Sequence, residues 1–108
     1  MNEIKININI ENLKSQTLII GNYFQCLEEK KALSLISEFT NDLYNFYSEL
    51  INVNIQDIDN KILLSLDSCF NDIIEGIKNE DYIWLGDIFI YRLLPIINEV
   101  GNIFSQLV

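Results

Sequence analysis

The chain has 108 residues, 49% of them apolar, no histidine and a formal net charge of −9. This length gives room for one domain with one hydrophobic core, which we place over residues 1–108. The missing histidine removes the commonest proton-transfer residue and metal ligand near neutral pH, and the acidic balance opposes direct binding to nucleic-acid phosphates, so we expect neither an enzyme nor a nucleic-acid-binding protein.

Alternating isoleucines mark the first ten residues, where Ile4, Ile6, Ile8 and Ile10 are separated by polar residues. A period of two built from a β-favouring residue predicts a short β-like arm over residues 1–10. Because no second stretch of this quality follows, such a strand needs a partner. It can pair with a second copy, pair with another protein's sheet edge or lie across helices, and a polar tail with chance alternation stays open.

Helical spacing begins after this arm. A first helix is predicted from about residue 11 to Glu29. Its apolar face consists of Leu13, Thr17, Ile20, Phe24 and Leu27. Gly21 either weakens this helix or marks a close contact with another one. We expect a short hinge at residues 28–31, with a continuous helix as the alternative.

The second helix has the clearest pattern in the chain. An unbroken alternation of four and three residues joins Ala32, Ile36, Phe39, Leu43, Phe46, Leu50 and Val53. Further apolar residues widen this face, namely Leu35, Tyr44, Tyr47 and Ile51. A face of this width predicts a bundle helix with two neighbours rather than a simple coiled coil.

A loop over residues 52–59 is predicted next, in which Asn54 or Asp57 can cap the following helix. The third helix is expected from about Ile58 to Lys78, with two apolar rows. One row is Ile62, Leu66, Cys69 and Ile73, and the other is Leu63, Phe70, Ile74 and Ile77. More than one face of this helix is therefore apolar.

The fourth helix is predicted to start at Asn79 as its cap, followed by acidic residues that favour the positive end of the helix dipole. It continues through Leu85, Phe89, Leu93, Ile96 and Val100. Pro95 removes one backbone amide and predicts a kink near Tyr91, and Gly101 is a candidate end of the helix. Four such segments with short connections predict an all-α fold, an antiparallel up-down four-helix bundle over residues 11–108.

No motif with catalytic or metal-binding spacing accompanies these helices. The carboxylate pairs lack the surroundings of a calcium loop, a di-iron site cannot form without histidine, and phosphate loops and Cys-x-x-Cys are missing from the sequence. We expect no cofactor. The candidate partner interface is instead Ile4, Ile6, Ile8, Ile10, Trp84, Asp87 and Tyr91. Trp84 and Tyr91 form one exposed stripe if the core uses the neighbouring apolar residues of the fourth helix.

The N-terminal residues lack the basic region and apolar run of a secretory signal, which predicts a cytoplasmic protein. The longest apolar window, residues 82–97, contains charges and a proline and is shorter than the ~20 residues of a membrane span, so we expect no membrane partner. Cys26 and Cys69 lie among apolar neighbours. We expect both to be buried and unpaired in a reducing compartment.

Residues 81–97 resemble a signature of an uncharacterised family of small helical proteins from low-GC bacteria. The matching residues are Asp81, Tyr82, Asp87, Tyr91 and Pro95 with their apolar spacing. Members of that family tend to carry acidic residues around the tyrosine, where this chain has Ile90 and Arg92. The resemblance implies a helical bundle and no particular activity.

The apolar surplus leads us to expect a noncatalytic protein-interaction module, either a homo-oligomer or an adaptor that binds another protein. Its size and composition are similar in architecture to flagellar and secretion chaperones, which shield an apolar helix of a client. The alternative is an acidic decoy that occupies a basic nucleic-acid-binding site, which requires one strongly negative face.

Overall fold

The computed structural model describes the backbone of residues 2–52 and 58–106, and the side chains of residues 9–52 and 58–106. Its elements are α1 (Asn2–Gln25), α2 (Glu29–Asn52), α3 (Asn60–Lys78), α4 (Tyr82–Asp87), the π-helix η1 (Ile88–Leu93) and α5 (Leu94–Ser105). Because α4, η1 and α5 follow one another without a break, these ranges form four helical rods. The predicted all-α class is confirmed.

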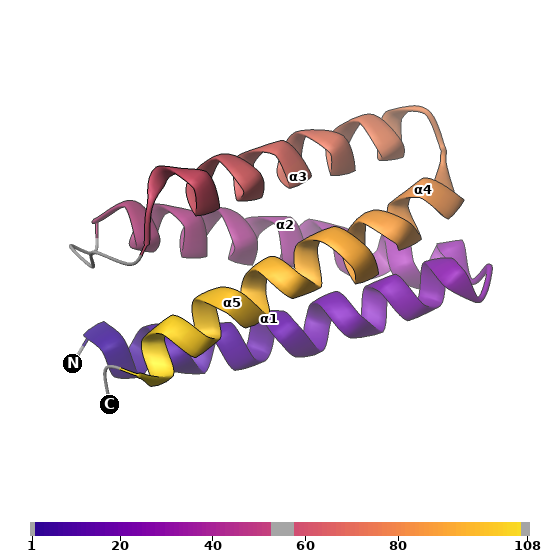
Figure 1. Cartoon of the computed structure of the whole chain (residues 1–108). Coiled ribbons are helices and arrows are strands. Elements are labelled where there is room, and N and C mark those ends of the chain that lie inside the picture. Colours follow the sequence, from indigo (N-terminus) through magenta and orange to yellow (C-terminus); the bar gives the residue numbers. More distant parts are fainter. Residues whose placement is uncertain (1, 53–57, 107–108) are drawn as a thin grey trace.

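The rods lie side by side along one long axis (Figure 1). α1 begins at the end of the molecule where α5 finishes, and the turns after α1 and α3 lie at the opposite end. The molecule measures 39 × 22 × 20 Å. Its length agrees with the roughly 36 Å that a helix as long as α1 spans at about 1.5 Å per residue.

The core consists of the apolar rows that the helical spacing predicted. In α2 every described residue of the main row is buried, from Ala32 to Leu50, whereas Val53 lies outside the described residues. Phenylalanines join three rods, since the ring centroids of Phe24 and Phe89 are 6.0 Å apart and those of Phe39 and Phe89 are 5.2 Å apart. Such aromatic pairs stabilise a core beyond the area that they bury.

Gly21 brings α1 close to η1. A Cβ atom at Gly21 would lie 2.5 Å from Ile90 Cδ1 and 3.1 Å from Phe89 Cβ, so a side chain there has no space. The prediction of a close helix contact at Gly21 is confirmed.

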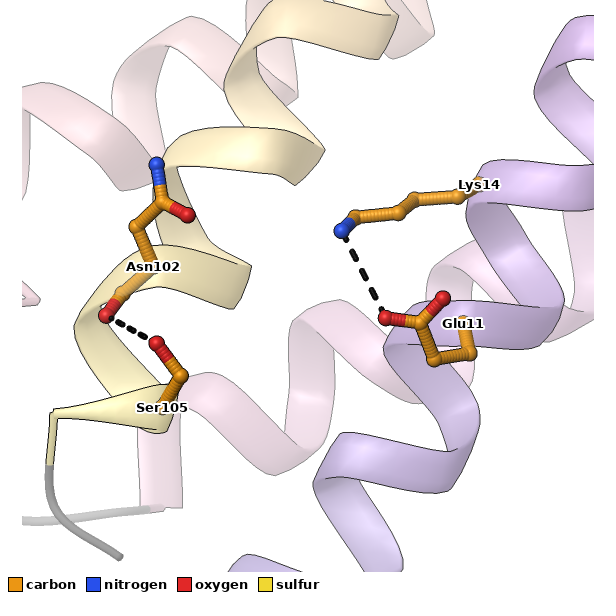
Figure 2. A network of polar contacts seen from close by, with 4 residues as sticks. All are labelled: Glu11, Lys14, Asn102 and Ser105. Atoms are coloured by element: carbon orange, nitrogen blue, oxygen red, sulfur yellow. Dashed lines mark hydrogen bonds and ion pairs between the residues drawn. The ribbon is translucent and has the colours of Figure 1, made fainter.

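At the other end of the same helix pair, Gly101 faces α1 with more space, because its nearest neighbour would be Ile10 Cγ2 at 3.2 Å. In Figure 2 the polar contacts drawn near this approach stay within their own helices. Lys14 pairs with Glu11 at 3.5 Å, and the Ser105 hydroxyl donates to the Asn102 carbonyl at 2.9 Å. The predicted helix end at Gly101 is wrong, since α5 continues to Ser105.

The predicted β-like arm is wrong. Residues 2–10, including Ile4, Ile6, Ile8 and Ile10, belong to α1. A lone strand leaves backbone N–H and C=O groups without partners, whereas a helix pairs these groups within itself. The spacing from Ile6 to Ile10 also fits one helix face, and Ile10 is buried in the core, as Leu13 is.

The expected hinge between the first two helices is a tight turn just before α2. Leu27 adopts a left-handed φ of 60°, and the Glu28 N–H donates to the Tyr23 carbonyl at 2.8 Å. Leu27 was predicted on the apolar face of the first helix, but this turn leaves it exposed. Cys26 is also exposed rather than buried, while Cys69 is buried as expected.

Two of the helices are capped by aspartates that differ from the predicted capping residues. The Asp59 side chain accepts the Ile62 N–H at 3.1 Å to start α3, and the Asp81 side chain accepts the Trp84 N–H at 3.2 Å to start α4. Asn79 lies at the C-terminus of α3 instead. The predicted caps Asn54 and Asp57 lie outside the described residues.

The distortion predicted near Tyr91 takes the form of η1. The Leu94 N–H donates to the Phe89 carbonyl five residues earlier, which is π-helical spacing. Pro95 follows as the second residue of α5. It has no N–H for the carbonyl four residues before it, so a regular α-helix cannot be completed there.

Candidate protein-binding groove

The contact between α2 and α3 is looser than the contact between α1 and α2. α2 lies closely along α1 but touches α3 at few places. Both helices carry a second apolar row beside the one that enters the core. The residues of these rows are Tyr44, Tyr47 and Ile51 on α2, and Leu63, Phe70, Ile74 and Ile77 on α3. Leu35, which was predicted on the same widened face of α2, lies nine residues before Tyr44 and therefore on the opposite side of this helix.

A hollow of about 210 Å³ lies between these two rows. It is lined by Leu43, Tyr44, Tyr47, Leu66, Asp67, Phe70 and Asn71, and we call it the α2/α3 groove. Leu43 and Leu66 form its buried floor, while Tyr47 and Phe70 are half-buried on its walls. Aromatic side chains around a small hollow are typical of the places where proteins anchor a partner's side chain.

Large apolar side chains stay uncovered along the same rows. Tyr44 is 61% exposed, Ile51 56% and Ile74 40%. Single exposed apolar residues are ordinary on protein surfaces, but several large ones on the two helices that enclose a hollow are characteristic of an interaction site.

The charge of this groove is negative. Among the described residues that line it, Asp67 carries the one charge, and Asn71 supplies an amide. The whole chain has a net charge of −9. The field over the groove therefore favours an approaching cationic segment over an anionic one.

A second hollow, with two basic residues in its lining, lies on the opposite side of α3. This hollow of about 560 Å³ lies between α3 and the last rod, and we call it the α3/α5 groove. Its lining consists of Lys61, Leu64, Ser65, Ser68, Cys69, Arg92 and Ile96.

Arg92, which η1 supplies, connects the last rod to α3 beside this second groove. Its Nη1 atom donates to Asp72 Oδ2 at 2.6 Å, and its Nη2 atom donates to Ser68 Oγ at 3.3 Å. The hydrogen bond to Asp72 raises the pKa of the guanidinium, so Arg92 stays charged throughout the accessible pH range.

Cys69 forms the floor beneath Arg92. Burial raises the pKa of its thiol above the ordinary value, and the nearby Arg92 charge opposes this change only in part. A thiol that stays protonated is a poor nucleophile, so Cys69 acts as a small apolar side chain.

The structure describes the side chains of only some of the predicted interface residues. Ile10 is buried, and the side chains of Ile4, Ile6 and Ile8 lie outside the described part of the structure. Trp84 packs partly against the core from α4, whereas Asp87 and Tyr91 are exposed. The exposed part of the Trp84 to Tyr91 stripe is thus centred on Asp87 and Tyr91.

The groove residues Tyr44, Tyr47 and Phe70 were absent from the predicted interface. Their signal was present in the sequence as the second apolar rows of the two helices. These rows were interpreted as packing against two neighbours, and the pattern alone does not tell a covered row from an open one.

Metal-binding clusters and membrane-spanning helices are both missing from residues 2–52 and 58–106, the part that the structure describes. In these ranges no cluster of three or more cysteine or acidic side chains is placed to hold a metal ion. No helix within the same ranges combines the length and the apolar character needed to cross a bilayer.

The fold and the grooves define a small acidic all-helical protein. The chain belongs to the family described as "Domain of unknown function (DUF8042)", whose model matches residues 5–103. No curated protein and no solved structure gives a match. The family match agrees with the predicted resemblance to an uncharacterised family, and it extends beyond residues 81–97 to all four rods.

Proposed function

We propose that the protein is a noncatalytic interaction module, an up-down four-helix bundle whose α2/α3 groove binds an amphipathic helix of a client protein. The observation that carries this proposal is the pair of second apolar rows, which face a shared hollow and are only partly covered. A helix laid between two helices buries such rows through apolar residues at spacings of three and four.

The size of the hollow favours a protein ligand. At about 210 Å³ it is smaller than the roughly 300–1,000 Å³ of a typical small-molecule pocket. It suits one large apolar side chain, with Tyr44 and Ile51 along the row to extend the contact. Anchors of this kind contribute most of the free energy of binding at protein interfaces.

The charge of the groove favours a basic client over a second copy. Two copies with a net charge of −9 repel one another, whereas a helix with lysine or arginine beside its apolar face is attracted to the rim at Asp67. In this proposal the protein acts in the cytoplasm as an adaptor or export-chaperone-like binder.

A designed peptide tests this function. The probe is a helical peptide of about 16 residues with leucines at spacings of three and four and lysines elsewhere, and its dissociation constant is measured by fluorescence anisotropy. Tyr44→Ser removes an exposed groove residue with little risk to the fold. We expect it to weaken binding at least about tenfold, because an aromatic anchor is lost.

The matched control is Tyr91→Ser, since Tyr91 is 69% exposed but lies on η1, away from the groove residues. It should change the affinity by less than about twofold. Equal losses in both variants, or no binding of the peptide at all, would show that the α2/α3 groove is not the client site.

The same peptide titration, repeated at several salt concentrations, distinguishes groove binding from the acidic-decoy alternative. A decoy binds basic surfaces through charge alone, so its affinity falls steeply with salt and does not depend on Tyr44. Groove binding keeps its apolar component at high salt, and replacing the lysines of the peptide by glutamine weakens it without abolishing it.

A further inference from the structure

The α3/α5 groove differs from the client groove in its charge. Lys61 and Arg92 are the charged residues among those described in its lining. Both are cationic, although acidic residues outnumber basic ones 16 to 7 in the chain. Asp72, 2.6 Å from Arg92, offsets one of these two charges, so Lys61, Arg92 and Asp72 together carry one net positive charge. A positive balance on an acidic protein is a local exception, and it favours an anionic occupant.

Arg92 retains hydrogen-bonding capacity toward this groove. A guanidinium has five N–H donors, of which the described contacts to Asp72 and Ser68 use two. The side chain is 40% exposed. The remaining donors can bind a carboxylate, for which the planar guanidinium geometry is well suited.

The spacing of the lining residues fits a helix. Lys61 and Ser68 lie seven residues apart on α3, which corresponds to about 10.5 Å of helix rise. Arg92 is held at the level of Ser68 by their hydrogen bond. Carboxylates seven residues apart on a docked helix therefore reach Lys61 and Arg92 together.

An apolar surface lies between the two cations. Leu64 is 67% exposed, and Ile96 lines the facing wall from α5. The hydroxyls of Ser65 and Ser68 add polar partners along the same side of α3. The order of cation, apolar surface and cation matches a helix whose apolar residue is flanked by acidic ones.

The π-helical segment fixes the position of Arg92. η1 interrupts the regular helix over Ile88–Leu93 and carries the guanidinium that reaches α3. π-helical turns are rare and occur frequently at functional sites.

We propose that the α3/α5 groove is a second docking site, which binds an acidic amphipathic helix of a protein other than the basic client. The two grooves lie on opposite sides of α3 and carry opposite charges, so the protein can join two different partners. This inference does not depend on the client function, because no residue lines both grooves.

The probe is an amphipathic peptide of about 16 residues with a leucine face and glutamates seven residues apart. Binding is followed by NMR, in which the Nε–H group of the one arginine and the Nε1–H group of the one tryptophan of the chain each give a single signal. We expect the Arg92 signal to shift on titration while the Trp84 signal stays constant, because Trp84 lies on α4 outside this groove.

Lys61→Glu reverses the charge of one of the two cations in the groove. It should lower the affinity of the protein for the acidic peptide at least about tenfold. Lys78→Glu is the matched control, because Lys78 is an exposed lysine of the same helix outside the groove lining. It makes the same change of net charge and should alter the affinity by less than about twofold. Tyr44→Ser should leave this binding unchanged.

Three results would overturn the second site. One is an unshifted Arg92 signal at saturating peptide, and another is an equal loss of affinity in Lys61→Glu and Lys78→Glu. The third is a shift of Arg92 when the protein alone is concentrated, which would assign this groove to a second copy of the chain.

Discussion

Gly21 shows how one missing side chain determines the distance between two helices. A Cβ atom there would lie 2.8 Å from Ile90 Cγ1 and 3.1 Å from Phe89 Cβ. A rotamer change of Ile90 does not move Phe89 Cβ, whose position the backbone of η1 sets, so the site stays tight. Gly21→Ala should lower the free energy of unfolding by about 1–2 kcal/mol, since overpacking exceeds the roughly 1 kcal/mol gained in helix propensity. Urea denaturation measures this change.

Gly101→Ala is the control for this prediction. Its nearest contacts would be at 3.2 Å and 3.4 Å, the latter to the flexible side chain of Lys14. The helix propensity of alanine should therefore prevail and leave the protein as stable as before, or more stable by up to about 1 kcal/mol. Stabilisation by Gly21→Ala would show that α1 and η1 are not in close contact.

The buried thiol of Cys69 should make the free energy of unfolding fall in alkaline solution. Burial raises the pKa of its thiol in the folded state above the ordinary value of 9.0. As the pH rises past 9.0, the unfolded chain releases this proton first, which lowers the free energy of the unfolded state relative to the folded one. The contribution of Cys69 is fully present below this pH and declines above it.

Chemical denaturation of the protein and of Cys69→Ala across this pH range measures the effect. The alanine variant is less stable at neutral pH because it leaves a cavity, but its stability should fall less steeply above pH 9.0. Cys26→Ala, at an exposed thiol, should follow the parent protein. Parallel curves for the parent and Cys69→Ala would contradict the raised pKa.

At the scale of the elements, the sequence was sufficient to predict the helices that carry a regular apolar row and the face that each of them buries. The buried residues of α2 and α3 follow the predicted spacing, because a helix face covered by neighbours selects apolar residues at that period. Residues 2–10 were predicted wrongly, because β propensity is a weak preference that the pairing of backbone groups overrides.

The helix ends were harder to predict for a physical reason. The turns after α1 and α3 use left-handed residues that are not glycine, Leu27 at φ 60° and Glu80 at φ 54°. Glycine is the usual sign of such a turn, and here tertiary packing enforces the conformation without it. The groove between α2 and α3 was also unpredictable in detail, since its openness depends on how closely two helices approach.

At the scale of the whole molecule, the net charge of −9 opposes self-association. We expect a monomer at low ionic strength and an increasing dimer fraction at high micromolar concentration as salt shortens the screening length from about 30 Å at 0.01 M to about 3 Å at 1 M. Multi-angle light scattering measures this change, and Tyr44→Ser should reduce the dimer fraction. Association that is strongest at low salt would point to ionic contacts instead.

The tight turn after α1 also gives the molecule a site for selective chemical labelling. Cys26 is exposed there, whereas the other thiol, Cys69, is sealed in the interior. The turn lies at the end of the rods away from the start of α1 and the finish of α5 (Figure 1). A maleimide dye or a biotin linker should therefore attach at a single place and orient every molecule alike on a sensor surface, with the flanks of α3 left facing the solution.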